Sequence, residues 1–128
     1  MSYYIAKAVD YSFEEAIVKT TAALKEVGFG IITTIDMQAK LKDAINKEIK
    51  PYVILGACNP SYAGAALDKE SRIGVMLPCN VIVRVDDSNN VEVAAINAYE
   101  TMQTVNNSEL DSVAKEVNDK LEQALKSL

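Results

Sequence analysis

The chain has 128 residues, of which 49% are hydrophobic and 24% charged, and its net charge at pH 7 is −5. These values are typical of one globular domain, which we expect to span residues 1–128. The sequence has no histidine and only two cysteines. It therefore excludes histidine-based nucleophile pairs, an HExxH zinc site and an all-cysteine zinc or iron–sulfur centre within one chain.

The charge pattern also indicates which partners to expect. The one lysine cluster, over residues 40–50, is interrupted by Asp43 and Glu48. Because phosphate binding needs clustered Lys and Arg, nucleic acid is not an expected partner. The sequence shows no signal-peptide pattern and no apolar run of the ~18 residues that a spanning helix needs, so we expect no membrane association and a cytoplasmic location.

The first elements follow from capping and periodicity. Residues 3–9 are predicted to form a strand, and Ser12-Phe13-Glu14-Glu15 is a capping box that predicts a helix start. The stripe that follows, which includes Thr20, has helical spacing, and Gly28 is expected to end the helix. A second strand is predicted over residues 29–35.

Asp36 is the expected N-cap of a shorter helix that runs to about residue 46. Its Leu41, Ala44 and Ile45 are expected to face inward. The apolar run over residues 51–57 predicts a strand buried on both faces. Asn59-Pro60 then predicts a third helix, because Asn is a favoured N-cap and Pro is favoured at the first helical position.

Strands are predicted over residues 80–85 and 91–96, linked by a turn at 86–90. This acidic turn lacks the spacing of a calcium loop, so no metal site is expected. Ser108-Glu109-Leu110-Asp111 is the expected cap of the last helix. The order β-α-β-α-β-α-β-β-α predicts an α+β fold, a two-layer α/β sandwich with a mixed or antiparallel sheet and helices on one face.

The two cysteines occur in matched dipeptides, Cys58-Asn59 and Cys79-Asn80, each directly after an apolar run. A thiol just before a helix N-terminus is favoured as a thiolate, so one interpretation of Cys58 is a reactive or redox thiol that pairs with Cys79. A second interpretation is that both are apolar fillers of a buried sheet. A third is that they contact a ligand without thiol chemistry.

The two asparagines have similar alternatives. Asn59 is explained as a helix cap, whereas Asn80 has no cap to form and either bonds loop backbone or points its amide into a pocket. Two amides beside two sulfurs on apolar walls would be typical of a ligand site. Tyr62, on the third helix, either closes such a pocket or covers the sheet edge. The candidate ligand-binding residues are therefore Cys58, Asn59, Cys79, Asn80 and Tyr62.

The region of these dipeptides resembles the DUF302 family, also called TT1751-like. The resemblance rests on the segments Ile54-Leu55-Gly56-Ala57-Cys58-Asn59-Pro60 and Ile73-Gly74-Val75-Met76-Leu77-Pro78-Cys79-Asn80-Val81-Ile82-Val83, with weaker matches over most of the chain. It departs from the family pattern at Ser71, where proline is frequent. The resemblance implies a compact α+β fold that commonly forms homodimers, and it implies no established reaction or cofactor.

Three functional hypotheses remain. The first, which we prefer, is a non-catalytic homodimeric module that binds a small apolar ligand around the two Cys-Asn motifs. The second is a thiol-dependent redox protein or enzyme that uses Cys58 and Cys79. The third is a structural or protein-interaction dimer in which the motifs serve only folding. No catalytic residue and no cofactor can be assigned from the sequence.

Overall fold

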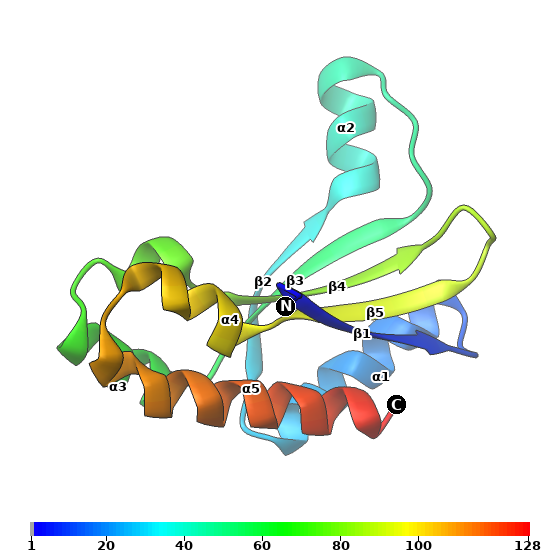
Figure 1. The fold of residues 1–128 in the computed structure, drawn as a ribbon. Helices are drawn as coiled ribbons and strands as arrows, with labels where there is room; N and C mark the ends of the chain where they lie inside the picture. The colour runs from blue at the N-terminus through cyan, green and yellow to red at the C-terminus, as the bar shows by residue number, and fades with distance from the viewer. Residues whose placement is uncertain (1) are drawn as a thin grey trace.

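The computed structural model describes residues 2–128, which form one antiparallel sheet with helices packed against it (Figure 1). The strand order is β1-β5-β4-β3-β2. The strands are β1 (Tyr4–Val9), β2 (Gly30–Asp36), β3 (Tyr52–Cys58), β4 (Cys79–Val85) and β5 (Val91–Ile96). The α+β architecture expected from the sequence is confirmed, and all four strand pairings are antiparallel.

The helices differ in how they meet the sheet. Helices α1 (Phe13–Glu26) and α5 (Asp111–Lys126) lie against one face of it, below the strands in Figure 1. The remaining helices are α2 (Met37–Ile45), α3 (Pro60–Lys69) and α4 (Ala98–Met102). Both α3 and α4 contact α5, whereas α2 projects on the opposite side of the sheet and makes its main contacts with β2 and β3.

The core lies between the sheet and the helices α1 and α5. Odd-numbered residues of the central strands, such as Leu55, Val81 and Val93, point into it because side chains alternate along a strand. Leu24 of α1 and Leu121 of α5 meet them and are fully buried. Burying a Leu side chain contributes about 1.5–3 kcal/mol, so these contacts fix the two helices on the sheet.

The helix starts confirm two of the expected caps. The Ser12 side chain accepts a hydrogen bond from the Glu15 backbone N–H at 3.1 Å, and Asp36 accepts one from the Ala39 N–H at 3.0 Å. The cap expected at Ser108 is wrong. A short 3-10 helix, Ser108–Leu110, precedes α5, and the Asn107 side chain caps it by accepting from the Glu109 N–H.

Two burial predictions are also wrong. The helix α2 has no buried residue, and Ala44 and Ile45 are exposed, because α2 stands off the sheet instead of lying on it. The strand β3 is not buried along both faces, since Tyr52 and Ile54 are half-exposed on the side away from the helices. Helix α4 was not expected from the sequence; Asn97 caps it by accepting from the Glu100 N–H at 3.0 Å.

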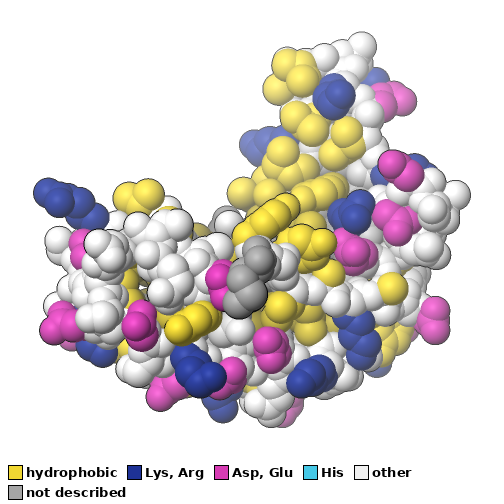
Figure 2. All heavy atoms as spheres, viewed as in Figure 1, with side chains coloured by type: hydrophobic (Ala, Val, Ile, Leu, Met, Phe, Trp, Pro, Cys, Tyr) yellow, Lys and Arg dark blue, Asp and Glu magenta, His cyan; other side chains and the backbone are white. Residues whose placement is uncertain are grey.

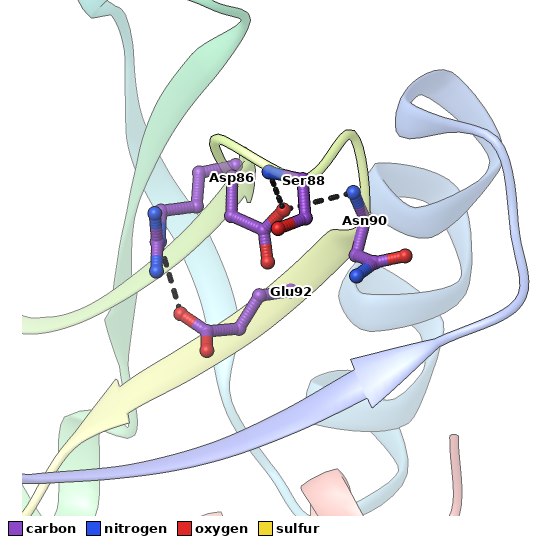
Figure 3. Close-up of polar contacts among 5 residues, drawn as sticks. Asp86, Ser88, Asn90 and Glu92 are labelled. Carbon is purple, nitrogen blue, oxygen red and sulfur yellow. Dashed lines mark hydrogen bonds and ion pairs between the residues drawn. The ribbon is translucent and has the colours of Figure 1, made fainter.

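The acidic segment between β4 and β5 is a turn, as expected. The Asp86 carboxylate accepts hydrogen bonds from the backbone N–H groups of Ser88 and Asn90, both at 2.9 Å (Figure 3). Asn89 adopts a left-handed conformation, which asparagine tolerates well. Among the described residues no helix is long and apolar enough to cross a membrane.

Candidate functional site

A cavity of about 290 Å³ lies where one end of the sheet meets α3, α4 and α5. Its walls come from the ends of β3 and β4, from the inner faces of the helices and from the loop before β4. The lining residues are Phe29, Ile32, Ala57, Cys58, Asn59, Tyr62, Ala63, Ala66, Leu77, Pro78, Cys79, Ala98, Met102, Leu110, Val113, Ala114 and Val117.

The cavity wall is overwhelmingly apolar. None of the lining residues within 2–128 is an Asp, Glu, Lys or Arg. The polar atoms near it belong to the two thiols, the Asn59 amide and the Tyr62 hydroxyl. General acid–base catalysis requires a positioned titratable group of suitable pKa, so these walls favour binding over proton transfer.

Asn59 is built into the junction between β3 and α3. Its Oδ1 accepts hydrogen bonds from the backbone N–H groups of Ser61 at 3.0 Å and Tyr62 at 3.2 Å, which confirms the predicted cap. Pro60 occupies the first helical turn, also as expected. The Asn59 Oδ1 is therefore occupied by hydrogen bonds from the first turn of α3.

Cys79 begins β4 directly opposite Ala57 of β3, on the side of the sheet that faces the core. Burial, and to a lesser extent the nearby Cys58, raise the pKa of its thiol to about 11. Cys79 is therefore a neutral thiol at physiological pH and not a ready nucleophile.

Cys58 is the last residue of β3 and is half-buried at the cavity wall. Over residues 2–128 both cysteines are free thiols. The two sulfurs therefore belong to one cavity, one of them more accessible than the other.

Tyr62 lies in the first turn of α3 and supplies an aromatic wall. Its ring is tilted by 31° against that of Phe29, with the centroids 6.3 Å apart. Phe29 is almost fully buried and follows Gly28 at the end of α1. Of the two alternatives for Tyr62, lining a pocket is the one that this position favours.

Asn80 is not part of this cavity. It pairs with Gly56 of β3, and its exposed side chain lies on the opposite face of the sheet from Cys79. The alternation of side chains along β4 makes this separation unavoidable. The structure therefore brings together Cys58, Asn59, Tyr62 and Cys79, and the two Cys-Asn dipeptides are not equivalent in space.

Several lining residues were not singled out from the sequence as site residues. Ala63 and Ala66 of α3 are small, which leaves the space that the cavity occupies. Val113 and Val117 belong to the apolar stripe of α5, which predicts burial but not a cavity. Met102 comes from α4, the helix that sequence patterns did not predict.

Comparison with known proteins then decides the family. The model described as "Domain of unknown function DUF302" matches residues 5–128. The chain belongs to the DUF302 family. This confirms the resemblance drawn from the Cys-Asn segments.

A solved DUF302 structure has the same fold. It is described as the crystal structure of an uncharacterized conserved protein DUF302 from Bacillus stearothermophilus, and it matches with a TM-score of 0.92 and 23% sequence identity over 98% of each chain. No curated protein matches this sequence. The similarity therefore shows the family and the fold, and the function must be argued from the site.

Proposed function

We propose that this DUF302 protein is a non-catalytic homodimer that binds a small apolar molecule in the cavity between the end of the sheet and α3, α4 and α5. The observation that carries this proposal is the cavity itself, whose walls are almost wholly carbon and sulfur. Concave apolar sites with a few polar groups are the usual form of a small-molecule site.

The size of the cavity limits the ligand. Its volume of about 290 Å³ is at the lower end of the range of ligand pockets, roughly 300–1,000 Å³. A dry apolar cavity of about 150 Å³ accepts benzene, so this one has room for a molecule of two fused rings. Because the described wall offers no charged partner, an ionised ligand would lose its hydration without compensation.

The thiol-dependent alternative has less support. A redox or nucleophilic role for the Cys58–Cys79 pair needs a thiolate at neutral pH, and the raised pKa of Cys79 disfavours one. The free thiols are compatible with a reducing compartment, so we keep the cytoplasm as the proposed location.

The test is isothermal titration calorimetry with two probes of equal ring size, 1-naphthol and 1-naphthoate. We expect 1-naphthol to bind and 1-naphthoate, which is charged at pH 7, to bind at least ~10-fold more weakly. Ala66→Leu fills the cavity from α3 and should abolish 1-naphthol binding. The matched control Ala22→Leu lies on the exposed side of α1 and should bind as the unmodified protein does.

Absence of heat with both probes, together with unchanged thermal unfolding in their presence, would contradict the binding proposal. Equal binding by Ala66→Leu and the unmodified protein would place the probe elsewhere and would also contradict it.

A further inference from the structure

The face of the sheet that points away from α1 and α5 is open. It is formed by the even-numbered residues of β1, β3, β4 and β5, among them Tyr4, Ile54, Ile82, Ala94 and Ile96. Among the elements described within residues 2–128, none packs over the centre of this face. An antiparallel sheet commonly has one solvated face, but that face is then polar, whereas this one is mainly apolar.

The apolar surface continues from the sheet onto α2. Figure 2 shows hydrophobic side chains running without a break from the strands up along this helix. Met37, Leu41 and Ile45 recur every four residues and so share one side of α2. Ile45 is 65% exposed and Tyr4 45% exposed, although both are large apolar residues. Contiguous apolar patches of this kind mark interaction sites.

The open face also contains a hollow, and the charges that line this hollow cancel. A hollow of about 570 Å³ lies on it, lined by Tyr4, Tyr52 and Ile82 among others. Its one cation, Arg84, is paired with its one anion, Glu92, at 2.9 Å between Nε and Oε1. The hydrogen bond to Glu92 raises the pKa of Arg84, so the pair stays charged and matched.

We propose that the open face and α2 together form the contact between two copies of this chain, with α2 of each copy seated in the hollow of the other. This inference rests on the proposed homodimer and identifies the surface that forms it. A projecting helix and a hollow occur on the same face, which is the self-complementarity that a two-fold contact requires.

Charge permits a second copy as the occupant. Each chain carries a net charge of −5, which opposes self-association in general, so two copies need to meet through a surface without local net charge. The open face is such a surface, because its two charges cancel within one chain. A basic partner would instead be drawn to the acidic remainder of the molecule.

The test compares three substitutions to Glu by light scattering after size exclusion and by sedimentation. Ile45→Glu alters α2 and Ile82→Glu alters the hollow. Val18→Glu is the matched control, since Val18 is 67% exposed and lies on α1, away from the open face. We expect the unmodified chain and Val18→Glu to be dimers. Each of the other two should weaken the dimer at least ~30-fold, the loss typical of a central contact residue.

Circular dichroism establishes that each variant is folded. A monomeric unmodified chain would overturn both this inference and the homodimer. A dimer that resists Ile45→Glu and Ile82→Glu would overturn this inference alone. Loss of the dimer in Ile82→Glu but not in Ile45→Glu would overturn the seating of α2. The calorimetric test of the cavity is independent of all three results.

Discussion

The side-chain amide of Asn59 lies directly over Gly28: a Cβ atom built on this glycine would stand 2.8 Å from Asn59 Nδ2. Gly28 follows α1 and has a φ of +89°, which side-chain-bearing residues rarely adopt. The same asparagine caps α3 through its other amide atom. One residue therefore ties the end of the first helix to the start of the third, at the edge of the cavity.

Gly28→Ala should destabilise the protein by about 1–3 kcal/mol, because it imposes a strained φ and a clash with Asn59. Chemical denaturation measures this change. Gly30→Ala is the matched control, since a Cβ there meets no described atom within 4 Å and φ is not positive. Equal losses at both positions would contradict the account of Gly28.

Asn59→Ala should cost about 1 kcal/mol of unfolding free energy, because two backbone N–H groups of α3 lose their acceptor. Asn59→Asp keeps an oxygen at the same place and should restore most of the stability. An Ala variant as stable as the unmodified protein would show that the cap does not hold α3.

Thr20→Val should stabilise the protein by about 1 kcal/mol, measured by denaturation. Thr20 is buried in α1, and its hydroxyl has no hydrogen-bond partner among residues 2–128. Thr21→Val is the control, since the Thr21 hydroxyl donates to the Ile17 carbonyl at 2.8 Å and its removal should bring no gain. A loss of stability in Thr20→Val would indicate that the buried hydroxyl is satisfied.

Stability should fall as the pH rises from 9 to 11, through the titration of Cys79. The unfolded thiol loses its proton near its ordinary pKa of 9.0, whereas the folded thiol retains it to about 11. The unfolded state therefore binds fewer protons in this window, and up to about 2–3 kcal/mol is lost.

Denaturation of the unmodified protein and of Cys79→Ala at pH 7.5 and 10.5 measures this effect, since the two proteins share every other ionisable group. The pH-dependent loss should be smaller in Cys79→Ala. Parallel losses in the two proteins would mean that Cys79 ionises equally in the folded and unfolded states.

The fold could be predicted from the sequence where local chemistry decides structure. The caps at Ser12, Asp36 and Asn59 each have a backbone cause within a few residues. The cap predicted at Ser108 is wrong for an equally local reason, because Asn107, one residue earlier, caps the 3-10 helix that precedes α5. Helix α4 has only five residues and no apolar stripe of its own, so periodicity could not reveal it.

The candidate site was predictable only in part. Matched dipeptides suggested matched positions, yet Asn59 follows a strand and enters a helix, while Asn80 lies within a strand and turns to the other face. The cavity depends on the small volumes of Ala63 and Ala66 opposite α5. Such tertiary distances leave no pattern in one sequence.

The central claim is that the cavity binds a small apolar molecule, and NMR mapping of 1-naphthol tests it most directly. We predict that amide shifts concentrate on residues around the cavity, such as Cys58, Tyr62, Ala66 and Val113, and vanish in Ala66→Leu. Shifts confined to the open face of the sheet, or none at saturating probe, would contradict the claim.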